Sequence, residues 1–488
     1  MGNLKKELAF GIVYTGMARY FGIFVSVIVS SILARVISPS DFGVVALASI
    51  FITFFSVLTT VGISPAIIQN KTITDCELEE INTFTIIIAI LLTFVFLLSV
   101  PLITFFYSNV NTLKNVLLLL SVSIFFSVAA IVPNAMLLID KEFKFIAKRT
   151  FLFQLIFGVI SVIGAVMGMG VYALLLNPIG TSVALFIVNF TKRPIGLRFP
   201  HKSSINKILS FSFYQMLFNF IYLIYRNIDK LVIGKAFGVT NLGYYEKSYR
   251  LMLLPLDNVS SIISPVLHPL LSEYQTELDY LWNAYKKILT LISEFSILIS
   301  VMLFFLARPI IVLLYGENWE PAVPIFKVLA LSICFQLIQA PLGAFFQSIN
   351  RVKDMVKCSL YVLVLMLMCI SISVWYDNFN ILPTLIVIAF FFGLVVYEYY
   401  ICQAYQKKLI EVLIIICPHF IYASFLFGLL YIATLFINDN NYISYSCVII
   451  LISTFYFLLL LKTNRVNNMK QVIVKSLKNI HNRAVLRR

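Results

Sequence analysis

Charged residues are scarce in this sequence of 488 residues. Asp, Glu, Lys and Arg make up 12% of it, whereas 60% is hydrophobic and the mean hydropathy is +0.95. Soluble proteins carry about 25% charged residues, because a water-facing surface must be solvated. The composition therefore excludes a soluble protein. Since apolar runs fill most of the chain, it also excludes a large catalytic domain outside the membrane.

Acidic residues are scarcer than basic ones, with 22 Asp and Glu against 37 Lys and Arg, and the net charge is +15. The basic excess lies in short connections between apolar runs, which is typical of membrane orientation rather than of nucleic-acid binding. If the N-terminus is inside, the even-numbered connections and the two termini, counted together with the span ends beside them, hold 27 of the 37 basic residues. We therefore expect both termini in the cytoplasm.

Motifs for catalysis, metals and cofactors are missing. The seven cysteines are scattered and the four histidines lie far apart, so we expect neither a disulfide framework nor a metal site. The sequence has no GxxxxGK[ST], HExxH, GxSxG or CxxC motif. We expect no enzyme, no ATPase and no cofactor, and any uphill transport must draw on an ion gradient or the substrate gradient.

What is present is a series of apolar runs bounded by charged, Pro, Gly or Asn residues. They predict an all-α membrane protein with about 14 transmembrane helices of about 20–25 residues each. The predicted spans are residues 9–37, 42–67, 82–107, 113–139, 148–168, 171–191, 209–236, 243–268, 288–315, 322–348, 355–376, 381–404, 410–436 and 442–462.

An internal repeat organises these spans. The matching pairs are residues 32–43 with 232–243, 63–65 with 263–265, 101–107 with 309–315, and Pro133 with Pro341. Because all pairs keep the same order, spans 1–6 and 7–12 are predicted to be two copies of one unit in the same orientation. Paired repeats place a substrate site at their interface and alternate access by rocking, which favours a transporter.

The repeat predicts five segments along the chain. They are an N-terminal six-helix lobe (1–191), a basic cytoplasmic linker (192–208), a second six-helix lobe (209–404), two extra transmembrane helices (405–462) and a basic cytoplasmic tail (463–488). Apolar residues recur in the tail at steps of three and four, with Lys and Arg between them. This pattern predicts an amphipathic helix on the anionic leaflet, and a disordered basic tail is the alternative.

Several cations fall inside predicted spans, where a charge normally faces a cavity or a partner. Arg19 lies ten residues into the first span, about 15 Å deep, unless the helix starts later and Arg19 snorkels to the surface. Arg226 and Lys230 share one helical face with Asp229 close enough to pair. Two interpretations remain for these residues: an ion pair that fixes the position of the helix, and a ligand site.

A charged stripe distinguishes the second copy of the repeat. Glu246, Lys247, Arg250 and Asp257 follow helical spacing, and their counterparts at offset 200 are Ala46, Leu47, Ile50 and Val57. Since the first copy is apolar there, the fold does not require the charges, and they point to a ligand. Glu294, Lys327 and Glu398 are isolated intramembrane charges and weaker candidates.

Two stretches of sequence now carry a resemblance. Residues 33–43 (LARVISPSDFG) and 62–66 (GISPA) resemble the Wzx-type polysaccharide-transport flippases of the multidrug/oligosaccharidyl-lipid/polysaccharide exporter superfamily. The resemblance implies two six-helix lobes around a central cavity, with two further helices. It also implies a flippase that moves an undecaprenyl-pyrophosphate-linked oligosaccharide, such as an O-antigen or other surface-polysaccharide repeat unit, from the inner to the outer leaflet.

The resemblance also assigns residues. In these flippases cations of helices 1, 2, 7 and 8 meet the pyrophosphate, and charge-assisted donors suit that group. The predicted substrate-binding residues are Arg19, Arg226, Lys230, Lys247, Arg250, Asn219, Gln215, Gln336 and Gln339. Helix 2 has no membrane cation here, which departs from the family pattern. Asp229 and Glu294 are the candidates for ion coupling, should coupling exist.

The expected location is the bacterial inner membrane, with membrane lipids around the protein and polysaccharide polymerase machinery as one candidate partner. Two alternatives remain. A multidrug exporter of the same superfamily would handle organic cations, which a cation-rich cavity would repel. A membrane polysaccharide polymerase usually needs a sizeable extramembrane loop, whereas the longest segment before the tail is the basic stretch near 192–208.

Overall fold

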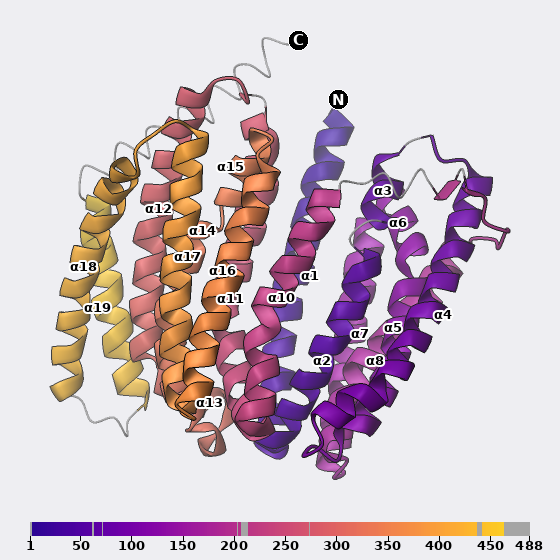
Figure 1. The fold of residues 1–488 in the computed structure, drawn as a ribbon, viewed down its shortest axis with the longest axis horizontal. Helices are drawn as coiled ribbons and strands as arrows, with labels where there is room; N and C mark the ends of the chain where they lie inside the picture. The colour runs from indigo at the N-terminus through magenta and orange to yellow at the C-terminus, as the bar shows by residue number, and fades with distance from the viewer. Residues whose placement is uncertain are drawn as a thin grey trace. The chain divides into compact units, whose positions relative to one another are not determined.

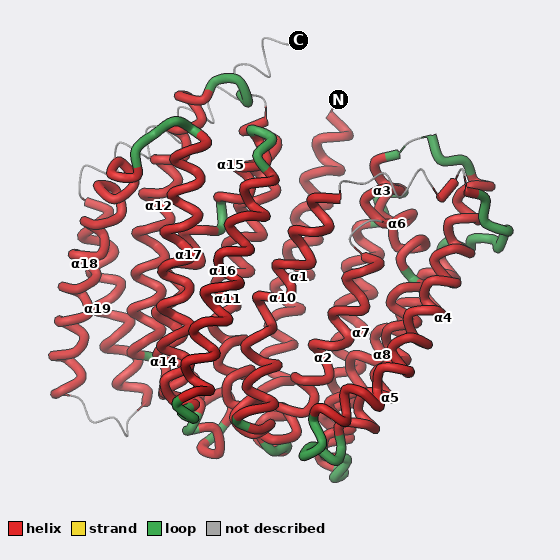
Figure 2. Tube along the Cα trace, viewed as in Figure 1, coloured by secondary structure: helices red, strands yellow, loops and turns green. Residues whose placement is uncertain are grey.

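The computed structural model describes residues 2–60, 63–70, 72–202, 204–205, 213–272, 274–436 and 442–462. Within these ranges the regular structure is helical throughout (Figures 1 and 2). The longer helices are α1 (Gly2–Val36), α2 (Pro39–Thr60), α4 (Asp75–Phe106), α5 (Leu113–Ala129), α7 (Phe143–Val166), α8 (Ala173–Lys192), α10 (Phe213–Ala236), α11 (Gly238–Ser272), α12 (Leu278–Phe305), α14 (Ala322–Gln339), α16 (Val352–Trp375), α17 (Leu382–Ala404), α18 (Leu409–Phe436) and α19 (Tyr442–Lys462). The short elements are α3 (Ile63–Gln69), η1 (Gly170–Tyr172), α6 (Ile131–Ile139), α13 (Ala307–Tyr315), η2 (Glu317–Trp319), α15 (Leu342–Ser348) and η3 (Phe379–Ile381).

The predicted all-α, multi-span membrane architecture is confirmed. In the described part of the chain, 9 helical spans are long and apolar enough to cross a membrane. Tyr20–Val36, Pro39–Phe55 and Tyr442–Tyr456 are shorter apolar helical stretches. Each predicted span coincides with a helix or with two consecutive helices, but a count of 14 membrane crossings is not confirmed. The predicted amphipathic tail, residues 463–488, lies outside the described residues.

The internal repeat is visible in the secondary structure. In the first copy the fourth span is interrupted between α5 and α6, and Pro133 lies in the first turn of the new helix. In the second copy α14 ends at Gln339 and Pro341 is the N-cap of α15. Proline fits at a helix start because its missing N–H would lack a partner there anyway. Both copies then use a short 3₁₀ turn, η1 or η3, to enter their sixth span.

The same two interrupted spans are the most buried of the nine. In Leu113–Ile139 and in Ala322–Ser348, 67% of the apolar window is buried, against 22–44% in the other candidate spans. An apolar helix with many exposed side chains is suited to contact with lipid. An apolar helix that other helices cover on most sides forms the core of a bundle. Each copy of the repeat is therefore built around its fourth span.

By their contacts the residues fall into two compact units. The first comprises residues 1–247, 314–321 and 366–379, and the second comprises residues 248–313, 322–365 and 380–488. In the first unit α1 packs on α7, α2 and α4 pack on α5, and α5 packs on α8 (Figure 1). In the second unit α12 packs on α14 and α18, and α14 packs on α17. The lobe boundaries predicted at residues 191 and 209 stay a prediction.

Candidate functional site

A charged cluster joins the end of α10 to the start of α11, where the sequence predicted pyrophosphate-binding cations. The Asp229 carboxylate is buried and accepts hydrogen bonds from the Tyr245 hydroxyl at 2.5 Å and from the Lys230 backbone N–H at 2.8 Å. The Lys230 ammonium lies 2.7 Å from a carboxylate oxygen of Glu246, in an ion pair that does not have hydrogen-bond geometry. Lys230 on α10 therefore forms an ion pair with Glu246 on α11.

Lys247 lies in a cage of aromatic rings within the first unit. Its ammonium donates to the Ser30 hydroxyl at 2.6 Å and lies 3.9 Å from the ring centre of Phe42. The rings of Tyr315 and Trp319 are 4.8 and 5.8 Å away. A cation held over ring faces is stabilised by their quadrupoles, more strongly when water is excluded. The cage thus ties the start of α11 to α1, α2 and η2.

Two of the other predicted substrate-binding cations, Arg226 and Arg250, have described side chains. Arg226 is half-buried, and its guanidinium lies 5.5 Å from the ring centre of Tyr222 one turn earlier. Arg250 is exposed on α11 and belongs to the second unit. Arg19 lies on α1, and Gln215 and Asn219 lie on α10, but their side chains are outside the described part of the structure.

The remaining predicted residues belong to the second unit. Gln336 is buried on α14, and its side-chain amide donates to the Ser332 hydroxyl at 3.0 Å. Gln339, three residues later, is half-buried, as is Glu294 on α12. The structure thus brings Asp229, Lys230 and Glu246 together, while the Gln336 amide also donates to Met252 Sδ on α11 at 3.5 Å.

Comparison of the two repeat copies indicates that Lys247 has a role beyond packing. Its counterpart at offset 200 is Leu47, which is fully buried, and Lys247 itself is only 4% exposed. The position is therefore buried in both copies, and an apolar side chain satisfies the fold in one of them. Because burying a charge costs free energy, a lysine at such a position calls for a reason beyond packing.

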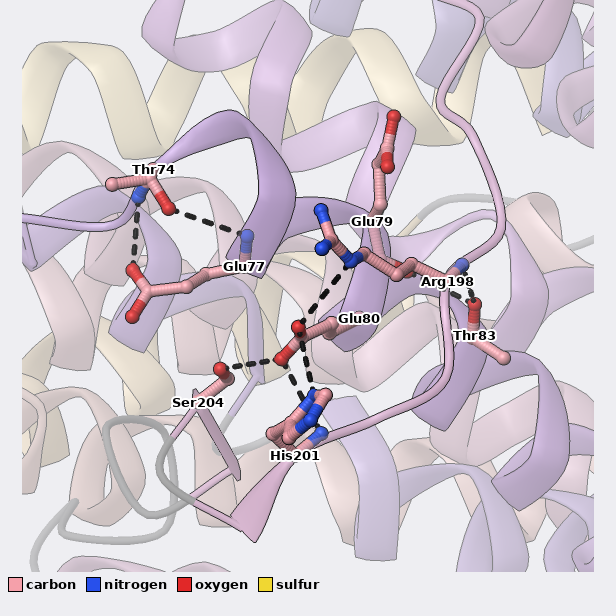
Figure 3. Close-up of polar contacts among 8 residues, drawn as sticks. All are labelled: Thr74, Glu77, Glu79, Glu80, Thr83, Arg198, His201 and Ser204. Carbon is pink, nitrogen blue, oxygen red and sulfur yellow. Dashed lines mark hydrogen bonds and ion pairs between the residues drawn. The ribbon is translucent and has the colours of Figure 1, made fainter.

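A second polar cluster anchors the predicted basic linker to α4. The buried carboxylate of Glu80 accepts hydrogen bonds from the Ser204 hydroxyl at 2.7 Å and the His201 backbone N–H at 3.3 Å, and lies 3.0 Å from His201 Nδ1 (Figure 3). Arg198 Nε is 3.9 Å from the same carboxylate, and its backbone N–H donates to Thr83. Glu79 points away from this cluster (Figure 3). The linker is therefore held against the start of α4.

Sequence reasoning missed two residues that the structure singles out. Trp319 is fully buried, and its indole N–H donates to the Ala34 carbonyl at 2.7 Å. The rarity of tryptophan, 3 in 488 residues, is the signal that marks it. Arg149 is 6% exposed in the second turn of α7, although it lies among basic residues at the start of the predicted span 148–168. No local pattern separates it from its exposed neighbour Lys148.

The sequence of the chain matches a known protein family. A family model described as "Polysaccharide biosynthesis protein" matches residues 32–324. An uncharacterized membrane protein in the cps region of Klebsiella pneumoniae is 26% identical over 326 residues, 64% of this chain and 65% of that protein. The lipopolysaccharide biosynthesis protein WzxC of Escherichia coli K12 is 22% identical over 377 residues, 74% of this chain and 73% of that protein.

Among solved structures, the inward closed conformation of the lipid II flippase MurJ has the same fold. The TM-score is 0.70 at 16% identity, and the match covers 92% of this chain and 99% of that chain.

Within the residues that the structure describes, no group of three or more His, Cys, Asp or Glu side chains could hold a metal ion.

Proposed function

Because the chain belongs to the polysaccharide biosynthesis protein family, we propose that it flips undecaprenyl-pyrophosphate-linked oligosaccharide, a repeat unit of surface polysaccharide or O-antigen, from the inner to the outer leaflet. It is a membrane transporter rather than an enzyme. The conformational change is alternating access, in which the two repeat copies rock against each other around the substrate.

The observation that carries this proposal is the extent of the family match. Residues 32–324 run from the end of α1 into α14, so they include all of α10 and α11. That region holds the charges that the first repeat copy lacks, including buried Lys230 and Lys247. A pyrophosphate carries negative oxygens that accept charge-assisted hydrogen bonds, which is the chemistry that Lys and Arg supply.

The proposed headgroup site consists of Arg19, Arg226, Lys230, Lys247 and Arg250. Among them Lys230 is balanced by Glu246, so a pyrophosphate would compete with a carboxylate for the same ammonium. This competition suits a transporter, because a site must release its substrate as well as bind it. Gln215, Asn219, Gln336 and Gln339 are the proposed contacts for sugar hydroxyls, which need matched donors and acceptors.

Ion coupling is proposed for the buried carboxylate of Asp229 and for Glu294. Asp229 is connected through Tyr245 to α11, so a proton gained or lost there would change the contact between α10 and α11. That contact also includes the Lys230–Glu246 pair. Protonation at Asp229 would thereby act on the same helices that hold the headgroup cations.

The chain is a multi-span membrane protein of a bacterial transporter family, and we propose the inner membrane as its location, with both termini cytoplasmic. The distribution of basic residues supports this orientation. The polymerase that consumes the flipped repeat unit is a proposed partner, since its substrate appears in the outer leaflet.

Reconstitution into liposomes tests the function directly. The purified protein is given a polyprenyl-pyrophosphate-linked oligosaccharide, and movement between leaflets is followed by accessibility to a membrane-impermeant, sugar-modifying reagent. We expect transport by the wild type, and at least a tenfold loss in Arg226→Gln and Arg250→Gln, because each removes a headgroup donor. Lys114→Met, which removes an exposed cation at the start of α5, should transport normally.

Absence of transport by the intact wild-type protein would contradict the flippase. Full activity in both arginine variants would reject the site while leaving the function standing. Efflux of organic cations from intact cells, with no movement of lipid-linked sugar, would support the multidrug exporter instead.

A further inference from the structure

A cavity in the first unit has none of the α10 and α11 cations among its described lining residues. Its volume is about 440 Å³, and it is lined from α3, α5, α6, α7 and α8. The polar lining includes Ser127, Asn134, Arg149, Thr150, Ser182 and Asn189. None of the described lining residues is acidic. The size is that of a small-molecule site rather than of a packing defect.

Arg149 is the charge in this cavity. Only 6% of Arg149 is exposed to solvent. Its Nη2 donates a hydrogen bond to the Asn134 side-chain oxygen at 2.5 Å. The Phe145 ring lies 5.7 Å from the guanidinium carbon. Its Nε and Nη1 are buried and have no hydrogen-bond partner among the described residues. These two nitrogens carry three N–H donors, so most of the guanidinium's bonding capacity remains for a ligand.

The nearest acidic residues in sequence are engaged elsewhere. Asp140 pairs with Arg193 at 3.4 Å, and Glu142 pairs with Lys192 at 3.4 Å. No ion pair joins Arg149 to a carboxylate in the described chain. A buried charge without a counter-charge is costly, and an anionic ligand with several acceptor oxygens would offset that cost. A phosphate group has this chemistry and suits the open donors of an arginine.

Asn189 adds a second requirement. Its Oδ1 is buried in the same cavity and also lacks a hydrogen-bond partner within the described part of the chain. This oxygen can only accept, so it fits a ligand hydroxyl and not a phosphate oxygen. A ligand that satisfies both residues carries a phosphate and a hydroxyl together.

The helix face that bears Arg149 points to a lipid as the source of that phosphate. Leu152 and Ile156, three and seven residues further along α7, lie on the same face and are 38% and 44% exposed. Exposed apolar side chains on a membrane helix are suited to acyl chains. Basic pockets between transmembrane helices near a membrane surface bind anionic lipid headgroups.

We propose that this cavity binds the headgroup of an anionic phospholipid, with Arg149 holding the phosphodiester and Asn189 accepting from a headgroup hydroxyl. Phosphatidylglycerol has both groups. Phosphatidylethanolamine would place an ammonium in a cavity whose described lining contains the cation Arg149 and no acidic residue. None of the proposed headgroup cations lines this cavity in the described part of the chain, and the proposal does not depend on the proposed flippase activity.

Lipid binding to the purified full-length protein tests this site. Native mass spectrometry in detergent measures retention of phosphatidylglycerol and of phosphatidylethanolamine with identical acyl chains. We expect the wild type to prefer phosphatidylglycerol at least tenfold and Arg149→Gln to lose that preference. Lys148→Gln is the matched control, because it removes an adjacent exposed cation. Ser127→Phe changes an exposed residue at the cavity without changing charge, and it should block binding even if Arg149→Gln fails to fold.

Wild-type retention of phosphatidylglycerol by Arg149→Gln, or an equal loss in Lys148→Gln, would overturn the proposal. Adding inorganic phosphate shows whether Arg149 binds the phosphate of a lipid headgroup or a soluble phosphate ion. Competition by millimolar phosphate together with binding of phosphatidylglycerol supports the lipid site. Arg149-dependent binding of inorganic phosphate without any binding of phosphatidylglycerol would assign the cavity to a soluble anion and reject the lipid.

Discussion

Gly43 and Gly243, which occupy equivalent positions in the two repeat copies, lie against each other near the starts of α2 and α11. A Cβ on Gly43 would be 1.7 Å from the Val239 carbonyl oxygen, and a Cβ on Gly243 would be 2.0 Å from the Pro39 carbonyl oxygen. Only glycine permits this backbone approach, because real Cβ contacts are never so short. The repeat found in the sequence therefore marks a point where its two copies touch.

Gly43→Ala and Gly243→Ala should each destabilise the protein. The added methyl meets backbone atoms, which cannot rotate away, so we expect a cost of about 1–3 kcal/mol or more. Thermal unfolding in detergent measures the effect. Gly428→Ala is the control, since a Cβ there meets nothing within 4 Å and should leave stability unchanged or slightly higher. An equal Tm for all three variants would show that the close approach is not maintained.

Glu80→Gln should loosen the linker from α4. The substitution keeps the side-chain shape but removes the charge that Arg198, His201 and Ser204 contact. We expect trypsin to cleave at Arg198 or Lys202 about tenfold faster, the factor for loss of one charge-assisted hydrogen bond. Glu79 lies outside this cluster, and its carboxylate packs against Gly196 of the linker (Figure 3). Glu79→Gln keeps the shape of that side chain and should be cleaved at the wild-type rate. Equal cleavage of both variants would argue against Glu80 as the anchor.

Tyr285→Phe should weaken the second unit. The Tyr285 hydroxyl donates to the buried Glu398 carboxyl, with oxygen distances of 2.6 and 2.7 Å. Removing it leaves a buried polar group without this donor, at a cost of about 1–3 kcal/mol. The unfolding temperature should fall, whereas Tyr399→Phe, at a tyrosine that is 55% exposed, should not change it. Unchanged stability in Tyr285→Phe would mean that water or another donor replaces the hydroxyl.

Alkaline pH should weaken the contact between the α17–α18 connection and the start of α12. The Lys407 ammonium donates to the Asp279 carboxylate at 2.7 Å, and this hydrogen bond raises the pKa of Lys407. A raised lysine pKa stabilises the folded state fully below the unfolded value of about 10.4, and the contribution is lost as pH rises through the folded value. Lys407→Met should therefore lower the Tm slightly at pH 8.

Lys408→Met is the control for the contribution of the Lys407 charge to stability. It removes a neighbouring lysine that is exposed to solvent. The difference in Tm between the two variants should narrow as the pH is raised beyond about 10.4. A difference that persists unchanged into strong alkali would mean that Lys407 stabilises the fold through packing and not through its charge.

The sequence by itself determined the membrane class, the helical content and the repeat. Length and hydropathy of apolar runs suffice for these, because in lipid a backbone must satisfy its own hydrogen bonds within a helix or a closed barrel. The starts of α6 and α15 were also marked in the sequence, since Pro133 and Pro341 cannot sit in a helix interior without breaking a bond.

Only the tertiary structure decided what each charge does. Within α10 Asp229 is the acidic residue beside Lys230, and the approach of α11 adds Glu246 as an ion-pair partner. Likewise, Lys148 and Arg149 are adjacent and both basic, and only the packing of α7 on its neighbours leaves one exposed and buries the other in a cavity. Hydropathy is a property of a segment, whereas the partner of a side chain depends on which helices meet, and residues far apart in the chain decide that.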